Sequence, residues 1–227
     1  MNIRVAALAL ATVAGSAFAG EVFPGPQTIN LGGGWQVTVA NALTTQITSV
    51  NGQTALQDGY LAITKTASFT QVDPFTDAPQ PISITFTQIA DDANTASVIR
   101  INQEFLTNLT GLTWGGFRQQ LALSGAATFD NASTGMSVGP NFTTNTMSAG
   151  NREMITSGGP GVASGSSWNP GATGDLIINI NLGASGTPVV FTLKEIPLVP
   201  TPGAKPEYAR SIFVRRLEHI LLLDERR

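Results

Sequence analysis

The sequence predicts an all-β fold, an antiparallel β-sandwich or jelly roll of about nine or ten short strands. Apolar and β-branched residues alternate with polar ones in one stretch after another, which is the period-two pattern of half-buried strands. Clusters of Gly, Pro, Asn and Asp separate these stretches as turns. No amphipathic helix is indicated between residues 20 and 204. Charged residues make up 12% of the chain, against about a quarter in an average domain, as in exported β-rich proteins.

The first half of the chain contains the clearest candidate strands. Residues 20–34 are rich in Gly and Pro and predict an irregular lead-in. Trp35, Val37 and Val39 then share one face of a strand that packs on the core. Asn51-Gly52 indicates a hairpin, because both residues tolerate the positive φ of a type I′ turn. Further strands are predicted at residues 43–50, 60–69, 82–89 and 97–106.

In the strand at residues 60–69, Leu61, Ile63 and Lys65 lie on one face by alternation. Trp114 falls in a turn-rich connection over residues 108–116. The following segment, 129–167, is crowded with Gly, Ser, Asn and Thr and predicts only short strands. Asn169-Pro170-Gly171 indicates a turn. The remaining strands are predicted at residues 117–123, 176–182 and 189–195.

Residues 1–19 are typical of a secretory signal. Arg4 supplies the positive start, residues 5–14 form an apolar run too short for a stable membrane anchor, and Ala17-Phe18-Ala19 suits a leader peptidase. The alternative is an N-terminal core helix. The chain has no cysteine, which excludes disulfides and, in an exported protein, favours a bacterial origin.

The C-terminal segment differs in charge from the body. The net charge is −3, which gives no general attraction to nucleic acid. The chain has 12 lysines and arginines, and half of them lie in the last stretch: Lys205, Arg210, Arg215, Arg216, Arg226 and Arg227. The body is therefore acidic and the tail basic.

A proline-rich junction at residues 197–204 separates the predicted domain, 20–196, from this tail. It contains the run Val199-Pro200-Thr201-Pro202-Gly203. Together with the leader and the β-rich body, this run resembles the sorting region of bacterial PEP-CTERM proteins. The resemblance implies an exosortase partner and delivery to the cell surface or the extracellular matrix of a Gram-negative biofilm producer.

The tail at residues 205–227 departs from that family, which needs about 20 apolar residues to span a membrane. Its longest apolar run is 220–223, so no stable membrane span is expected. An amphipathic helix can form after Pro206. Three interpretations stay open for it: a degenerate or frame-shifted sorting helix, a helix that binds an interface or partner, and a helix packed on the domain.

Little in the body points to catalysis. The single histidine, His219, lies in the tail, so histidine-dependent nucleophiles and zinc sites of the N/S type are excluded from the body. A glycosidase needs paired carboxylates, and the candidates are Glu104, Glu153 and Asp130. Each is expected on a solvated strand face or in a loop. The sequence therefore predicts a protein that is not an enzyme.

No cofactor is predicted, and calcium is the one candidate ion. Calcium prefers carboxylate and carbonyl oxygens, and acidic residues cluster in the two loops on either side of the strand at residues 82–89. They are Asp73, Asp77, Asp91 and Asp92. The competing interpretation is that these side chains cap turns in solvent.

The predicted function is a structural or adhesive, non-catalytic role of an exported cell-surface or matrix protein, with an extracellular polysaccharide as a possible partner. The alternative is a carbohydrate-binding module that stacks sugars on exposed tryptophans. Trp114 and Trp168 are the candidates, because both fall in turn-rich connections. If all the tryptophans are buried in the core, this alternative fails.

Overall fold

The computed structural model covers the chain from Met1 to Arg227 and describes residues 26–40, 45–49, 60–122, 125–136, 138–182 and 187–200. For residues 45–49 it describes the backbone alone. The predicted leader at 1–19, the Asn51-Gly52 hairpin and the tail at 205–227 lie outside the described residues. Among the described residues, no helix is long and apolar enough to cross a membrane.

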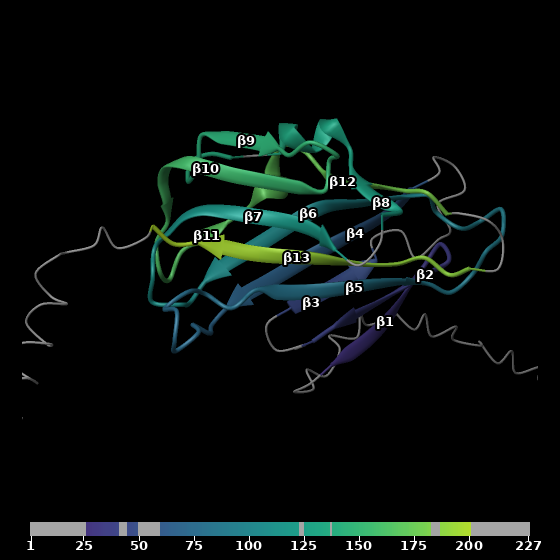
Figure 1. Ribbon diagram of the computed structural model, residues 1–227, viewed down its shortest axis with the longest axis horizontal. Helices are drawn as coiled ribbons and strands as arrows, with labels where there is room; N and C mark the ends of the chain where they lie inside the picture. The colour runs from purple at the N-terminus through teal and green to yellow at the C-terminus, as the bar shows by residue number, and fades with distance from the viewer. Residues whose placement is uncertain are drawn as a thin grey trace, which may run out of the picture.

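Two β-sheets packed face to face form the domain (Figure 1). The first sheet is antiparallel throughout, in the order β1-β2-β5-β13-β7-β10-β9. Its strands are β1 (Gln27–Gly32), β2 (Trp35–Val39), β5 (Ile82–Gln88), β13 (Val190–Leu198), β7 (Trp114–Ala122), β10 (Glu153–Val162) and β9 (Thr144–Met147).

The second sheet has the order β3-β4-β6-β12-β8, and β11 also pairs with β6. Its strands are β3 (Thr45–Ser49), β4 (Tyr60–Phe69), β6 (Val98–Asn108), β12 (Leu176–Ile180), β8 (Ala127–Phe129) and β11 (Ser167–Trp168). The pair β4–β6 is parallel. Two short 3₁₀ helices, η1 (Asn131–Gly135) and η2 (Pro170–Ala172), lie beside this sheet. The all-β sandwich predicted from the sequence is thus confirmed.

The expected irregular lead-in is wrong in its second half, because β1 begins at Gln27 and pairs with β2. The turn between them uses Gly33 and Gly34, whose φ values are 54° and 79°. A Cβ on Gly34 would lie 2.8 Å from the side chain of Thr95. The glycines that suggested an irregular lead-in are therefore what a tight hairpin turn requires.

Three further expectations about the strands are wrong. Trp114 opens β7 instead of lying in a turn, and Trp168 belongs to β11. The segment expected to hold only short strands contains β10, which is 10 residues long. Glycines at the end of β10 adopt positive φ, so the strand continues through residues whose composition suggested loop.

Strand β13 runs to Leu198 and passes through the boundary predicted between the domain and the proline-rich junction. Pro197 pairs with Phe117 of β7. The other neighbour, β5, pairs with β13 only as far as Glu195. One edge of the strand is therefore free of ladder hydrogen bonds at Pro197, and a proline is tolerated there.

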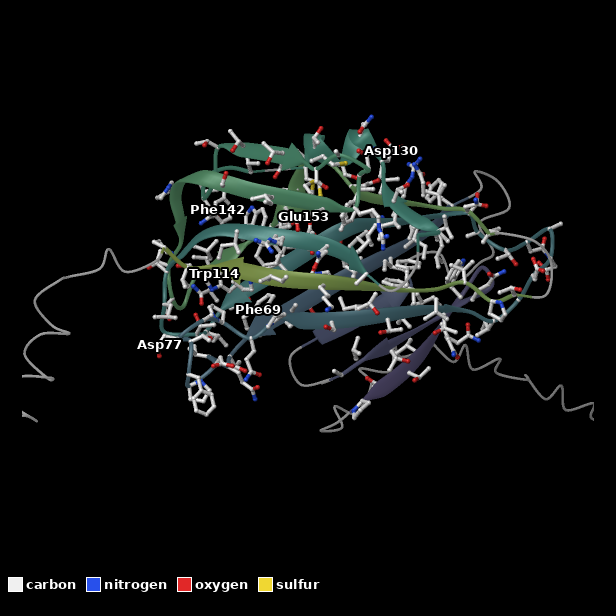
Figure 2. The ribbon with its side chains drawn as sticks, viewed as in Figure 1. Phe69, Asp77, Trp114, Asp130, Phe142 and Glu153 are labelled. Atoms are coloured by element: carbon white, nitrogen blue, oxygen red, sulfur yellow. The ribbon has the colours of Figure 1, made fainter. Side chains whose placement is uncertain are left out.

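The interior between the sheets holds two apolar clusters. The larger one, the main core, includes Trp35, Ile63, Ile101, Leu121 and Leu193. The smaller one, the aromatic cluster, lies at one end of the sandwich, where Figure 2 labels Phe69, Trp114 and Phe142. Its buried members are Ala67, Phe69, Leu106, Trp114, Phe117, Phe142, Val162 and Trp168.

Candidate functional site

Four polar side chains occupy the interior between the main core and the aromatic cluster. Lys65 on β4 follows Ile63 of the main core and precedes Ala67 of the aromatic cluster. Glu104 on β6 lies directly opposite Lys65 in the second sheet. In the first sheet, Gln119 on β7 and Glu195 on β13 are likewise opposite each other. We call these four residues the buried polar cluster, and each is at most 2% exposed.

A bulge in β6 is what turns Glu104 inward. Ile63 pairs with Ile101, but the next residue of β4, Thr64, pairs with Gln103, so Asn102 has no partner in the register. Strand residues alternate between the two faces, and one extra residue reverses the alternation beyond it. Without the bulge, Glu104 would face solvent and Gln103 would lie opposite Lys65.

The short helix η2 covers this bulge. A Cβ on Gly171 would lie 2.8 Å from the backbone nitrogen of Glu104 and 3.1 Å from the Cα of Gln103. Only a glycine lets η2 approach the strand this closely. The turn predicted at Asn169-Pro170-Gly171 therefore supports the position of a buried carboxyl group.

Short contacts connect the four side chains across both sheets. The Nζ atom of Lys65 lies 2.5 Å from Oε1 of Glu104 and 2.6 Å from Oε1 of Glu195. The Nε2 atom of Gln119 donates to the two carboxyl oxygens of Glu104 at 3.4 and 3.3 Å. Two of these contacts, Lys65–Glu195 and Gln119–Glu104, join one sheet to the other.

Burial determines where the protons of the cluster lie. Burial, with a smaller contribution from Glu104, raises the pKa of Glu195 to about 8, although the charge of Lys65 acts in the opposite direction. Burial alone would lower the pKa of Lys65, but the two carboxyl groups outweigh it and raise that pKa above its ordinary value. At pH 7 Glu195 is therefore protonated, and Lys65 is charged.

The Glu195 carboxyl group also has an unpartnered atom. Its Oε2 is buried and makes no hydrogen bond, whereas its Oε1 accepts from Lys65. An unpaired buried polar atom costs about 1–3 kcal/mol. The side chains of Lys65, Glu104 and Glu195 are fully enclosed, so no substrate diffusing in solution reaches them. The four side chains can therefore react only with one another, or they serve to hold the two sheets together.

The outer face of the first sheet has a different character over β1, β2 and β5. Thr28, Thr38, Thr85 and Thr192 lie directly opposite one another on four adjacent strands. Their hydroxyl groups pair at 2.9 Å (Thr28–Thr38) and 3.1 Å (Thr85–Thr192). We call the outward residues of the three strands the hydroxyl–amide face: Thr28, Asn30, Gln36, Thr38, Ser83, Thr85 and Thr87. None of them is charged.

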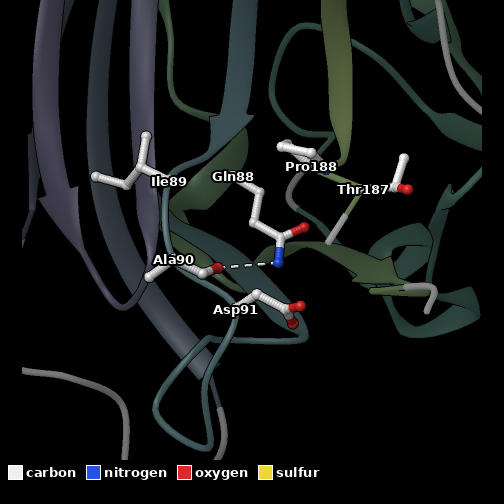
Figure 3. A pocket seen from close by; sticks show the side chains of 6 residues that line it. All are labelled: Gln88, Ile89, Ala90, Asp91, Thr187 and Pro188. Carbon is white, nitrogen blue, oxygen red and sulfur yellow. Dashed lines mark hydrogen bonds between the residues drawn. The ribbon is translucent and has the colours of Figure 1, made fainter. Parts of the chain in front are cut away.

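A small pocket of about 140 Å³ lies where β5 ends, beside the segment that leads into β13 (Figure 3). Its central side chain is Gln88, whose Nε2 donates to the carbonyl of Ala90 at 2.9 Å. The Oε1 of Gln88 accepts from the backbone nitrogen of Val189 at 3.0 Å. The amide thus ties two chain segments together.

The expectation that Trp114 and Trp168 are exposed is wrong. Trp114 is 0% exposed and Trp168 is 2% exposed. The ring of Phe69 packs edge-on against Trp114 at 5.0 Å, and Phe142 packs against Trp168 at 4.8 Å. Trp35 is also buried. Neither candidate can stack on a sugar in this structure, so the tryptophan-based alternative fails.

The acidic loops predicted as calcium candidates are turns on either side of β5. Asp73 accepts hydrogen bonds from the backbone nitrogens of Phe75 and Thr76, which lower the pKa of its carboxyl group. Asp77 adopts a φ of 53° in the same loop. Asp92 accepts from the backbone nitrogen of Asn94, and Asp91 lines the small pocket. No group of three acidic or histidine ligands occurs in the part of the chain that the structure describes.

The three carboxylates considered for hydrolysis are not brought together. Glu104 points into the interior, whereas Glu153 lies on the outer face with its Oε2 at 3.8 Å from Nε of Arg118. Asp130 caps η1 by accepting from the backbone nitrogen of Ala132. The expectation that Glu104 is solvated and unpaired is wrong, because the bulge places it beside Glu195, a residue that the sequence did not single out.

The described part of the predicted sorting motif packs on the domain. Val199 contacts the aromatic cluster. A Cβ on Gly115 would lie 3.0 Å from the ring of Pro200, so this ring lies close against β7. Thr201, Pro202 and Gly203 lie outside the described residues. Comparison of the chain with protein-family models, with curated proteins and with solved structures gives no significant match.

Proposed function

We propose that this chain is an exported, non-catalytic β-sandwich with a structural or adhesive role at the cell surface or in the extracellular matrix of a Gram-negative bacterium. The hydroxyl–amide face is the observation that carries the proposal. Three adjacent strands present only Thr, Ser, Asn and Gln outward. Such a face offers hydrogen bonds to a neutral, hydroxyl-rich polymer without the desolvation cost of charged groups.

An extracellular polysaccharide is the partner that this surface fits. Without an aromatic platform, the energy of each sugar contact is small, since a net hydrogen bond contributes about 0.5–1.5 kcal/mol. Many weak contacts along a polymer suit adhesion to a matrix better than capture of a single sugar. The PEP-CTERM-like leader and proline motif supply the route of export in this proposal, with an exosortase as the sorting partner.

The location is tested by fractionating a tagged full-length chain in the producing bacterium. The proposal expects the domain outside the cytoplasm, with its leader removed before Gly20. Mass spectrometry of the C-terminus then reports whether the chain is cut near residues 199–203. Full-length protein ending at Arg227 and free in the medium contradicts sorting through the tail. Protein retained in the cytoplasm contradicts the whole proposal.

Binding is tested by retention on columns of the host's neutral exopolysaccharide. The double variant Thr38→Val/Thr85→Val removes two hydroxyl groups while keeping β-branched side chains. This double variant should bind the polysaccharide more weakly than the wild type, by roughly 1–3 kcal/mol. Thr146→Val, on the outer face of β9, is the matched control and should bind like the wild type. Equal retention of both variants, or no retention of the wild type, rules out this face as the binding surface.

A further inference from the structure

We propose that Lys65 and Glu195 become joined by an intramolecular amide bond, between the Nζ atom of the lysine and the side-chain carbonyl carbon of the glutamate, with Glu104 as the proton carrier. The bond would be a covalent cross-link between the two sheets. This proposal rests on the geometry of the buried polar cluster. It goes beyond the proposed surface role, and either proposal can fail without affecting the other.

The reacting groups are already in place. Nζ of Lys65 lies 2.6 Å from Oε1 of Glu195, and a carboxyl carbon is only about 1.2 Å from its oxygen. Groups held at such distances react as if at very high concentration. The nitrogen is simultaneously 2.5 Å from Oε1 of Glu104, which is within proton-transfer distance.

Hydrogen bonding distinguishes the two carboxyl groups. Both carboxyl oxygens of Glu104 accept a hydrogen bond from Nε2 of Gln119, and such donors stabilise a negative charge. Glu195 has no donor on Oε2, which is buried without a partner. Loss of that oxygen removes an unsatisfied polar atom from the interior. Glu195 is therefore the acyl group and Glu104 the base, and the protonation of Glu195 at neutral pH agrees with these roles.

The reaction balances without any further reagent. The Lys65 ammonium gives one proton to the Glu104 carboxylate, and the resulting amine attacks the carbonyl carbon of the protonated Glu195. The new C–N bond forms, the C–OH bond of Glu195 breaks, and the hydroxyl group leaves as water with a second proton from the nitrogen. The products are a neutral amide, one water molecule and a protonated Glu104, so atoms and charge are conserved.

The surroundings favour the product. The three side chains are 0% exposed, and buried charges are costly when compared with neutral groups of similar size. Condensation replaces the ammonium and the carboxylate by an amide and a carboxylic acid. Because water is largely excluded from the interior, hydrolysis of the amide is slow. The bond connects β4 to the last strand, across a sequence separation of 130 residues.

Mass spectrometry tests the proposal on the full-length chain. The purified folded protein should lack the mass of one water molecule, and a digest should contain a branched peptide that joins the segments around residues 65 and 195. Fragment ions then identify the two linked side chains. Since the chain has no cysteine, a cross-link that survives boiling in detergent is not a disulfide.

Three variants define the chemistry. Lys65→Arg keeps the charge but removes the attacking amine, and Glu104→Gln removes the proton acceptor while leaving both linked residues in place. Both should show the full mass. Lys194→Arg is the matched control, because Lys194 is the neighbour of Glu195 on the opposite face of β13, and it should keep the loss of water.

Wild-type protein that is folded by circular dichroism and has its full mass overturns the proposal, whatever the variants do. A branched peptide that joins Lys65 to Glu104 or to Gln119 overturns the assignment of Glu195. Loss of water that persists in Lys65→Arg or in Glu104→Gln contradicts the role of the altered residue.

Discussion

Lys65 and Glu195 lie on different sheets, yet the lysine Nζ is 2.6 Å from Oε1 of the glutamate. Glu195 is on β13, the last strand in the part of the chain that the structure describes, so this contact connects β13 to β4 in the opposite sheet. Two buried carboxyl groups around one lysine are a costly arrangement. Because they lie between two apolar clusters, we expect them to specify how the sheets pack.

Removal of the lysine should be strongly destabilising. Lys65→Met keeps the apolar part of the side chain but leaves the two buried carboxyl groups without their cation. The free energy of unfolding should fall by at least about 3–5 kcal/mol, measured by urea denaturation. Lys194→Met, on the outer face of β13, should change it by less than about 0.5 kcal/mol. A loss below 1 kcal/mol for Lys65→Met would show that the cluster is not needed for packing.

The bulge at Asn102 should be sensitive to a single methyl group on η2. Gly171→Ala places a Cβ within 3 Å of the Glu104 backbone nitrogen, so the helix or the strand must move. We expect a loss of about 1–3 kcal/mol in unfolding free energy and a smaller cross-linked fraction by mass spectrometry. Gly125→Ala is the control, since nothing lies within 4 Å of its Cβ position. Equal effects of the two changes would contradict the close approach of η2.

The rate of cross-linking should depend on pH through Glu195. The ionisable groups that face it are Lys65 on β4 and Glu104 on β6, and Gln119 beside it is uncharged. The reactive state carries the proton on Glu195, whose pKa is raised to about 8. The rate should therefore reach its full value below pH 8 and fall by about tenfold per pH unit above it.

This dependence is measurable on chain purified unfolded from inclusion bodies, in which the cluster has not assembled. Dilution into buffers of different pH starts folding, and samples quenched in acid report the loss of water over time. A rate that rises steadily above pH 8 would mean that the deprotonated amine, and not protonated Glu195, limits the reaction.

The sequence predicted much of the strand pattern because alternation is local. It placed Lys65 on the same face as Leu61 and Ile63, which is correct and is the one signal that pointed to a buried lysine. Alternation cannot reveal a bulge, because one extra residue reverses the faces without changing composition. Glu104 was therefore expected in solvent, although it lies 2.5 Å from Lys65.

Glycine misled the prediction in another way, because it made two strands look like loops. The glycines that follow Trp114 and those near the end of β10 weaken the strand pattern, so both regions looked like loops. In the structure Gly116 pairs with Ser157 of β10, and a Cβ on Gly161 would meet the carbonyl oxygen of Trp114. These glycines let two strands approach closely. Which residues meet across the two sheets depends on this long-range packing, which no local pattern encodes.

Extension of the full-length chain by atomic force microscopy is the most direct test of the claim that Lys65 and Glu195 fasten the two sheets. A cross-linked chain cannot extend between residues 65 and 195, a separation of 130 residues, which corresponds to about 430–470 Å of extended chain. The wild type should therefore release that much less length than Lys65→Arg when pulled from its ends. Equal extension of the two proteins would contradict the covalent fastening.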